Sequence, residues 1–308
     1  MSAVVRAPGA AEQAPAPPPR AARTWRGPWR PPYVLAAVTV GYLVWSLAPV
    51  LLAVLFSFNA GRSRSTWQGF SMRWYYEDPT LSVWHDESLR TALTHTLLLG
   101  VLTTLVAVPL GVAFALGLDR WHGRLPAAAN FAMLLSFVIP EIVMGIGLFF
   151  MVTLLATPFT LGTTAQVVGL VTFQLSYPVV IVRARLATIG PHYEEAARDL
   201  GATAFGAMRR VLMPMLMPAI LTSAILVFAD VLDDFIIVRY LSSDASTETS
   251  SIKIYNTARG APTPALNAIA TLMLLASFVV VLLGWLAVRR TGRDAEEPGS
   301  LGAFAGQV

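Results

Sequence analysis

Six long apolar blocks alternate with short polar segments along the chain. Each block is roughly 20 residues or longer, the length that a helix needs to cross a hydrocarbon core of about 30 Å. Because the backbone must satisfy its own hydrogen bonds in lipid, such blocks form helices. The pattern predicts an all-α, polytopic membrane protein with six transmembrane helices, at about 33–58, 92–118, 127–156, 165–183, 218–238 and 266–288.

The polar ends of the chain flank a transmembrane domain over 31–290. The segment 1–30 is rich in alanine, proline and arginine, a composition that buries too little apolar surface to become ordered. We expect it to be a disordered cytoplasmic tail, with a second cytoplasmic tail at 291–308. The first apolar block is longer than the core of about 7–15 residues of a signal peptide, so it is expected to stay as an uncleaved span.

The basic residues indicate the orientation of the chain in the membrane. With the N-terminus inside, the inner segments hold fifteen of the 22 Arg and Lys residues, and the outer segments hold seven. Positive charge collects on the cytoplasmic side of membrane proteins. The distribution therefore predicts that both termini are cytoplasmic.

Composition excludes several other classes. The charged fraction is 13%, against about 25% for soluble domains, and the arginines flank apolar blocks instead of forming a basic patch for nucleic acid. The chain has no cysteine and four scattered histidines, so neither a disulfide nor a metal site is expected. The one lysine, Lys253, lies between two isoleucines, outside any P-loop pattern, so this chain is not expected to hydrolyse ATP.

The inner segment 187–214 has the pattern of two short helices. Pro191 and the acidic pair Glu194 and Glu195 suit the start of the first helix. Gly201 lies where that helix would end and turn, and Pro214 marks the entry into the fifth span. A helix–glycine–helix hairpin of this kind suits docking into another protein, although an interfacial connector that covers the bundle has the same pattern.

The residues of this hairpin resemble the EAA motif of binding-protein-dependent ABC importer permeases. Glu195, Ala196 and Ala197 are followed by Gly201 and Pro214 in the register of that motif, with Val211 and Met213 where the family has Ile and Leu. The resemblance implies a type I importer bundle in the bacterial cytoplasmic membrane. It also implies that this segment couples to an ATPase, through Glu194, Glu195, Ala196, Ala197, Gly201 and Pro214.

The same resemblance implies the partners of the chain. They are a second permease subunit, two ATPase subunits, an extracytoplasmic solute-binding protein and the surrounding lipid. No cofactor is expected on this chain, because ATP and Mg²⁺ would be bound by the ATPase subunits. No covalent chemistry is expected either: the chain would provide alternating access across the membrane.

Four carboxylates lie inside the predicted spans: Glu141, Asp230, Asp233 and Asp234. An aspartate at a helix centre costs about 2.5–3.5 kcal/mol on insertion scales, so such groups face a cavity or a partner. The three aspartates are spaced i, i+3 and i+4, which predicts a shared helix face. They indicate a cation path, to which Tyr177 can add a cation–π contact. Helix capping, bonding between subunits, a misplaced span boundary and simple aromatic packing are the alternatives.

Three short stretches resemble the spermidine/putrescine permeases. They are Ile139–Ile146 with its Pro-Glu pair, Leu232–Ile237 with its Leu-Asp-Asp sequence, and Lys253–Tyr255 in the last outer loop. The resemblance implies polyamine import. Lys253 and Tyr255 are candidate docking residues for the solute-binding protein, with a solvated outer loop as the alternative interpretation. Iron, phosphonate or another small solute as cargo stays open, as do a secondary transporter, a channel and an intramembrane enzyme. His95 is expected to be packed or hydrogen-bonded rather than a proton relay.

Overall fold

The computed structural model describes residues 33–63, 66–121, 123–155, 160–260 and 263–292. The predicted tail 1–30, and all of the tail 291–308 except the first two residues, lie outside this range. The chain divides into two units, Met1–Pro49 and Val50–Val308. Within the described residues the structure is helical, and its one β-bridge pairs Asn59 with Phe70.

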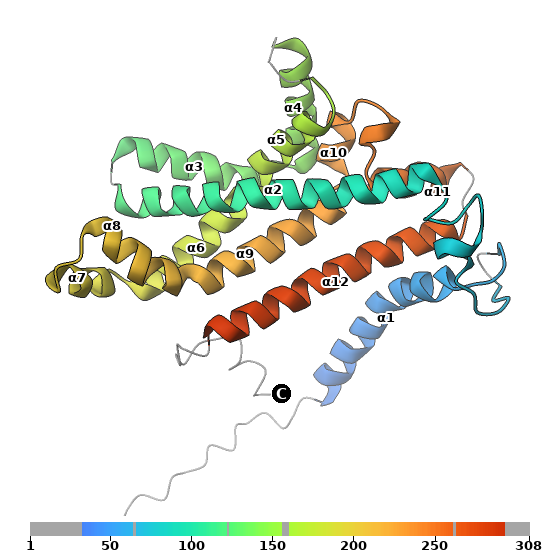
Figure 1. Cartoon of the computed structure of the whole chain (residues 1–308), viewed down its shortest axis with the longest axis horizontal. Coiled ribbons are helices and arrows are strands. Elements are labelled where there is room, and N and C mark those ends of the chain that lie inside the picture. The colour runs from blue at the N-terminus through green and yellow to red at the C-terminus, as the bar shows by residue number, and fades with distance from the viewer. Residues whose placement is uncertain (1–32, 64–65, 122, 156–159, 261–262, 293–308) are drawn as a thin grey trace, which may run out of the picture. The chain divides into compact units, whose positions relative to one another are not determined.

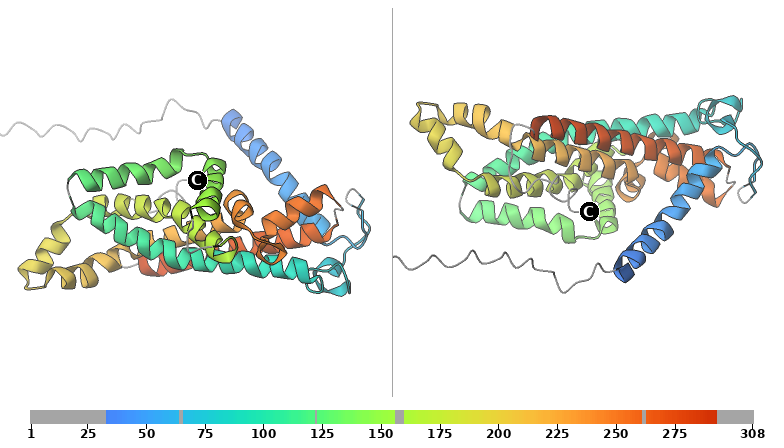
Figure 2. Two further views of the ribbon diagram at one scale, coloured as in Figure 1. Left: turned by 90° about the horizontal axis from the view of Figure 1, so that it is seen from above. Right: turned by 90° about the horizontal axis from the view of Figure 1, so that it is seen from below.

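The larger helices follow the apolar blocks of the sequence. Among them are α2, the longest helix, and α9 and α12, which pack side by side (Figures 1 and 2). The helices are α1 (Tyr33–Ser57), α2 (Glu87–Arg120), α3 (Arg124–Val138), α4 (Glu141–Leu154), α5 (Thr163–Gln174), α6 (Ser176–Ile189), α7 (His192–Asp199), α8 (Ala204–Ala207), α9 (Met213–Asp233), α10 (Ile236–Leu241), α11 (Ser250–Arg259) and α12 (Ala265–Gly292), with the short turns η1 (Arg73–Glu77), η2 (Met208–Leu212) and η3 (Ala245–Thr247).

Length and hydropathy identify the membrane spans among the described residues. Five helical segments are long and apolar enough to cross a membrane, and α3 with α4 forms a sixth candidate if the bent pair is one span. The five are Tyr33–Ser57, Glu87–Arg120, Thr163–Ile189, Ala204–Asp233 and Ala265–Arg290. The all-α, polytopic class predicted from the sequence is therefore confirmed.

The third predicted span, 127–156, is divided between two helices. α3 ends at Val138 and α4 begins at Glu141, with an angle of 113° between them. Pro140 has no N–H group to donate, and it disfavours helical geometry at the residue before it. Ile139 accordingly has φ −67° and ψ 125°. The break puts Glu141 at the start of a helix, and residue 156 lies outside the described range.

The fifth predicted span, 218–238, differs at both of its ends. The helix begins earlier, because η2 leads directly into α9 at Met213, and it ends at Asp233. Asp234 has φ −56° and ψ 129°, which is outside helical geometry, and α10 follows as a separate helix. The fourth span also has a break, at Leu175, and Pro178 falls in the first turn of α6, where its missing N–H costs little.

Small residues let the central helices approach closely. A Cβ atom added at Gly111 of α2 would collide with the ring of Pro178 in α6, and it would lie 3.3 Å from the carbonyl oxygen of Leu175. One at Gly169 of α5 would meet Leu241 of α10. Such close contact is typical of membrane helices, because lipid supplies no hydrophobic force between them and packing must hold them together.

The segment between α1 and α2 folds into a compact polar loop. The indole Nε1–H of the buried Trp74 donates to the carbonyl oxygen of Asn59 at 2.6 Å. The Asn59 amide donates to the carbonyl oxygens of Ser63 and Thr66, both at 3.0 Å. Asp78 accepts from the backbone N–H groups of Thr80 and Leu81 and from the guanidinium of Arg73. These bonds hold the loop in one conformation ahead of the first residue of α2, Glu87.

The Asp78 carboxylate should make this loop sensitive to acid. Hydrogen bonds from the backbone N–H groups of Thr80 and Leu81, and then from Arg73, hold the pKa of Asp78 well below its usual range. A depressed folded pKa means that the stabilisation is complete above the ordinary aspartate value of about 3.9 and is lost as the pH falls below it. Limited proteolysis between pH 7 and pH 3 should show the loop opening as the pH falls.

Two variants distinguish the effect of the Asp78 carboxylate on loop cleavage from that of the neighbouring Glu77. Asp78→Asn should raise loop cleavage at pH 7 and flatten the pH dependence. Glu77→Gln, which changes an exposed side chain in the same loop, should do neither. An unchanged pH profile in Asp78→Asn would show that another group controls the loop.

Candidate functional site

The four carboxylates predicted to line a path lie around the junction of α4, α9 and α10. Glu141 is the first residue of α4, Asp230 and Asp233 lie in the last turn of α9, and Asp234 follows that helix. Electrostatic interactions connect Glu141 with Asp230, Asp233 and Asp234. Among the residues that the structure describes, none of the four forms an ion pair with an arginine or lysine.

Asp230 is held by an amide from the fourth span. The Nε2 atom of Gln174, at the end of α5, donates to Oδ2 of Asp230 at 2.6 Å. The side chain of Gln174 is fully buried, and its Oε1 atom has no hydrogen-bond partner within the described residues. An unsatisfied buried acceptor costs about 1–3 kcal/mol of folding free energy. The unpaired Oε1 atom of Gln174 therefore destabilises the fold at a position next to the Asp230 carboxylate.

Asp234 has a different environment from Asp230. Its side chain is buried, and its Oδ1 atom accepts from the backbone N–H of Val238 in α10 at 3.2 Å. Its carbonyl oxygen accepts from the hydroxyl of Ser251 in α11 at 2.7 Å, and its carboxyl group interacts electrostatically with Glu141. Asp234 thus joins the starts of α10 and α11 and lies near Glu141 at the start of α4, so the capping interpretation describes part of its environment.

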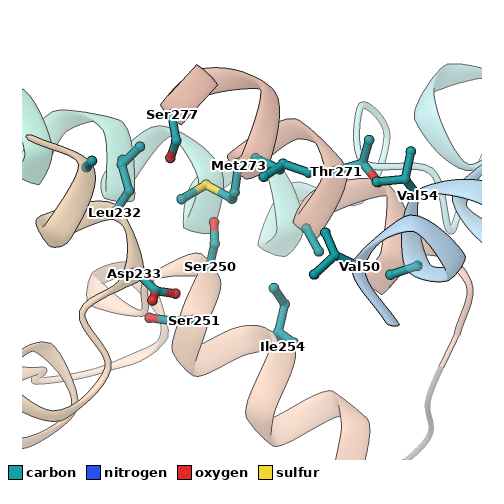
Figure 3. Close-up of a pocket in the computed structure, with 14 residues that line it drawn as sticks. Val50, Val54, Leu232, Asp233, Ser250, Ser251, Ile254, Thr271, Met273 and Ser277 are labelled. Atoms are coloured by element: carbon teal, nitrogen blue, oxygen red, sulfur yellow. The ribbon is translucent and has the colours of Figure 1, made fainter. Parts of the chain in front are cut away.

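Asp233 points into a separate cavity of about 470 Å³ (Figure 3). Ser250, Ser251, Thr271 and Ser277 contribute hydroxyl groups to this cavity, and the rest of its lining is mostly apolar. α9 ends at Asp233, but the backbone N–H of Asp234 still donates to the carbonyl oxygen of Asp230 at 3.0 Å, so the helical spacing of the aspartates reaches Asp234. All three aspartates interact electrostatically with Glu141, and Asp233 in addition lines this cavity.

Tyr177 lies on the α6 side of the carboxylates. It interacts electrostatically with Asp230 and Glu141, and its ring packs edge-on against Phe137, with 5.3 Å between ring centroids. Its hydroxyphenyl group therefore lies near the carboxylates and also packs against an aromatic neighbour. The packing interpretation describes part of its environment, and the cation–π contact stays a prediction.

Two buried glutamines, Gln166 and Gln174, were not predicted from the sequence, because the candidate site was chosen from the charged residues. Gln174 positions Asp230. The Oε1 atom of Gln166 accepts a 2.8 Å hydrogen bond from Nε2 of His95, and its Nε2 atom donates to the carbonyl oxygens of Val238 and Thr247. His95 is thus buried and hydrogen-bonded, as predicted. An uncharged amide within an apolar block is the signal that would have found both glutamines, because lipid gives it no partner.

The predicted coupling segment, 187–214, forms two helical pieces with a glycine turn. α7 ends at Asp199, and Gly201 has φ +88°, a conformation that favours glycine. The backbone N–H of Ala202 donates to the carbonyl oxygen of Ala197 at 3.0 Å, which closes the turn. Thr203 then caps α8 by accepting from the N–H of Gly206 at 3.1 Å. Pro214 lies in the first turn of α9.

The segment 187–214 exposes three large apolar side chains. Leu200 is 91% exposed, Phe205 is 66% exposed and Tyr193 is 47% exposed. Glu195 and Ala196 are exposed beside them, and Ala197 is half-buried. Exposed apolar groups with a polar rim are typical of a protein interface, which favours the docking interpretation of this hairpin.

One predicted coupling residue is tied to the second span. Glu194 of α7 accepts two hydrogen bonds from Nη2 of Arg120, the last residue of α2, at 2.7 and 3.0 Å. Glu195 has no comparable contact with another helix: its partner is His192 on the same helix, at 3.7 Å. The pair Arg120–Glu194 therefore joins the hairpin to the longest helix of the bundle.

Comparison with known proteins defines the class. Residues 107–292 match the family described as the binding-protein-dependent transport system inner membrane component. The chain therefore belongs to this family, and it is a permease subunit of an ABC importer. The predicted resemblance is confirmed, and membership of the family sets aside the secondary transporter and the intramembrane enzyme.

Particular relatives are found among polyamine permeases. The chain is 31% identical to the putrescine transport system permease protein PotI of Escherichia coli (strain K12), over 87% of this chain and 94% of the relative. It is 31% identical to the spermidine/putrescine transport system permease protein PotC of the same strain, over 78% of this chain and 88% of the relative. These relatives are permease subunits and not enzymes.

A solved structure has the same fold. It is that of a bacterial ABC transporter involved in the import of the acidic polysaccharide alginate, with a TM-score of 0.68, 16% sequence identity, and coverage of 84% of this chain and 96% of that one. This likeness confirms the type I importer bundle and carries no information about cargo.

The Arg120–Glu194 pair leads to a test of coupling. Its side chains are 42% and 24% exposed, so the pair should add no more than about 1 kcal/mol to stability. Reversing either charge, by Arg120→Glu or Glu194→Arg, should nevertheless lower ATP-driven uptake several-fold in the assembled transporter, because it separates α7 from α2. The double reversal should restore most of the uptake.

The control for this experiment is Arg124→Glu, which reverses an exposed charge near the same end of α2. It should leave uptake close to that of the unaltered chain. If the double reversal is as defective as the two single variants, the contact between Arg120 and Glu194 does not transmit motion.

Proposed function

We propose that this permease imports polyamines such as putrescine and spermidine across the bacterial cytoplasmic membrane. An extracytoplasmic solute-binding protein would deliver the cargo, and a second permease subunit would complete the path. Two ATPase subunits would bind ATP and Mg²⁺, hydrolyse the ATP and grip the segment 187–214. The residues assigned to coupling are Glu194, Glu195, Ala196, Ala197, Gly201 and Pro214, and both termini of the chain would be cytoplasmic.

The observation that carries the choice of cargo is the group of carboxylates at the junction of α4, α9 and α10. Glu141, Asp230 and Asp234 lie together there, and no arginine or lysine among the described residues forms an ion pair with them. Within a membrane, such groups need a positive partner. A polyamine carries several ammonium groups, and Gln174 Oε1 and the Tyr177 ring are further groups that an ammonium can contact.

The three aspartates have different roles in this proposal. Asp230 would contact an ammonium group in the path, and Asp234 would do so while it holds the starts of α10 and α11. Asp233 points into a separate cavity, so it would contribute long-range negative charge to the path. The relatives PotI and PotC are permeases for putrescine and for spermidine and putrescine, which agrees with this assignment.

Reconstitution of the full transporter tests the proposal. The chain would be purified with its second permease, ATPases and binding protein, and placed in proteoliposomes with ATP on the ATPase side. Labelled putrescine or spermidine should accumulate, and an ATPase variant unable to hydrolyse ATP should abolish the uptake. Uptake of ferric iron or of a phosphonate, with no uptake of either polyamine, would contradict the assigned cargo.

A further inference from the structure

A second cavity lies at the end of the bundle that carries α10 and α11, away from α7 and α8 (Figure 1). Its volume is about 500 Å³. The first turn of α4 forms one side, and α10 and α11 form the others. Its polar and aromatic lining residues are Phe235, Arg239, Tyr240, Tyr255, Asn256 and Arg259. The two charged residues of the lining are both arginines.

Both arginines are exposed and held in place by their helices. The Cζ atom of Arg259 lies 4.4 Å from the ring centroid of Tyr255, and that ring lies 4.8 Å from the ring of Phe235. Arg239 is fixed through its backbone N–H, which donates to the carbonyl oxygen of Phe235 at 3.0 Å. Within the described part of the chain, neither guanidinium forms an ion pair with a carboxylate.

The carboxylates of the proposed path lie next to this cavity. Glu141 immediately precedes the lining residue Ile142, and Asp234 immediately precedes Phe235. The other acidic side chain near the lining, Glu248, accepts a hydrogen bond from Asn256 at 3.1 Å. A cation that approaches Glu141 and Asp234 through this cavity would pass two arginines, and like charges would repel it.

An entrance with unpaired positive charge opposes the entry of a cation, unless a partner supplies negative charge. Arginine is suited to this purpose, because its planar guanidinium makes two parallel hydrogen bonds to a carboxylate. The arginines are also exposed, on the side that the proposed orientation makes extracytoplasmic. Charge complementarity therefore favours an acidic protein surface as the occupant of this site.

We propose that Arg239 and Arg259 form the docking contact for acidic side chains of the extracytoplasmic solute-binding protein. Docking neutralises the two guanidinium groups, and cationic cargo that the binding protein releases then enters the path toward Glu141 and Asp234. This inference rests on the proposed function for the side of the membrane and for the charge of the cargo. In this proposal, Arg239 and Arg259 repel cationic cargo until the solute-binding protein has docked.

The test measures the affinity between the assembled transporter and its binding protein. The complex of this chain with its second permease and ATPases would be placed in nanodiscs of zwitterionic lipid, and the purified binding protein titrated against it. Arg239→Gln with Arg259→Gln should weaken binding by about tenfold or more and reduce its dependence on salt. Arg239→Lys with Arg259→Lys keeps the charge and should retain most of the affinity.

The matched control is Arg90→Gln. Arg90 is an exposed arginine in the first turns of α2, at the same end of the bundle and outside the cavity lining. It should leave the affinity unchanged. An affinity loss that is equal in the control and in the double glutamine variant would mean that general positive charge, and not this site, attracts the binding protein, and it would overturn the proposal.

Three other results would overturn it. The double glutamine variant could bind as tightly as the unaltered chain. It could change the uptake of cargo without changing affinity, which would make the arginines contact cargo. It could lose affinity only in nanodiscs that contain anionic lipid, which would assign the arginines to phosphate headgroups. The affinity measurement does not depend on the cargo, so a transporter that imports another solute would contradict the proposed function and leave this result intact.

A second measurement covers the case in which the glutamine variant does not assemble. The chain has no cysteine, so a single cysteine at position 239 or 259 is a unique attachment site. A short photoreactive cross-linker at either position should capture the purified binding protein, and one at position 90 should not. The absence of a cross-link from both positions, in a complex that hydrolyses ATP, would overturn the proposal.

Discussion

Asp230→Asn should reduce ATP-driven polyamine uptake at least tenfold while the transporter assembles normally. The asparagine oxygen can still accept from Gln174 Nε2, which donates to Asp230 Oδ2 at 2.6 Å, so the variant removes the charge and keeps the shape. A hydrogen bond to a charged group contributes about 1.5–3 kcal/mol. Since each 1.4 kcal/mol or so corresponds to a tenfold change, the loss should be about 10- to 100-fold.

Two further variants show whether the position of Asp230 matters as well as its charge. Gln174→Leu removes the donor and should reduce uptake less than Asp230→Asn, since the carboxylate remains. Asp233→Asn, whose side chain points into the separate cavity, should have the smallest effect of the three. Unchanged uptake in Asp230→Asn, with normal assembly measured by size-exclusion chromatography, would remove Asp230 from the path.

Gly111→Leu should prevent the accumulation of folded protein. An added Cβ atom at this position already collides with the ring of Pro178, and the carbonyl oxygen of Leu175 lies 3.3 Å from it. Overpacking typically costs about 1–3 kcal/mol, and a leucine adds three more carbon atoms at this α2–α6 crossing. Gly111→Ala, the smaller change, should lower the melting temperature of the purified chain in detergent.

The same helix supplies the control. Gly117 lies further along α2, and a Cβ atom there would meet nothing within 4 Å. Gly117→Leu should therefore give a normal yield and melting temperature, and Gly117→Ala should be neutral or slightly stabilising, because alanine is the better helix former. Equal yields from Gly111→Leu and Gly117→Leu would show that the crossing of α2 with α6 adapts to the larger side chain.

Local patterns predicted the segments whose structure depends on their own residues. The apolar blocks gave the helices, since the transfer of each side chain into lipid depends mainly on that side chain. Gly201 predicted the turn after α7, because φ +88° is favourable for glycine. Pro140 likewise accounts locally for the break in the third span, where α3 and α4 meet at 113°.

The candidate site shows where such patterns stop being informative. The three aspartates have helical spacing, and yet the helix ends among them. Asp234 leaves helical geometry because its side chain and carbonyl oxygen bond to Val238 and Ser251. Val238 is four residues away and Ser251 is 17 residues away, so a local window contains only part of the reason for the helix end.

The sequence by itself determined the class of this protein: a helical membrane permease with a helix–glycine–helix hairpin and charged groups within its spans. The tertiary structure decided which of those groups meet. Gln174 reaches Asp230 across 56 residues, and Arg120 reaches Glu194 across 74. These contacts depend on the rotation and crossing of whole helices. Those are set by the packing of all the helices together, such as α2 against α6 at Gly111, and no segment specifies them alone.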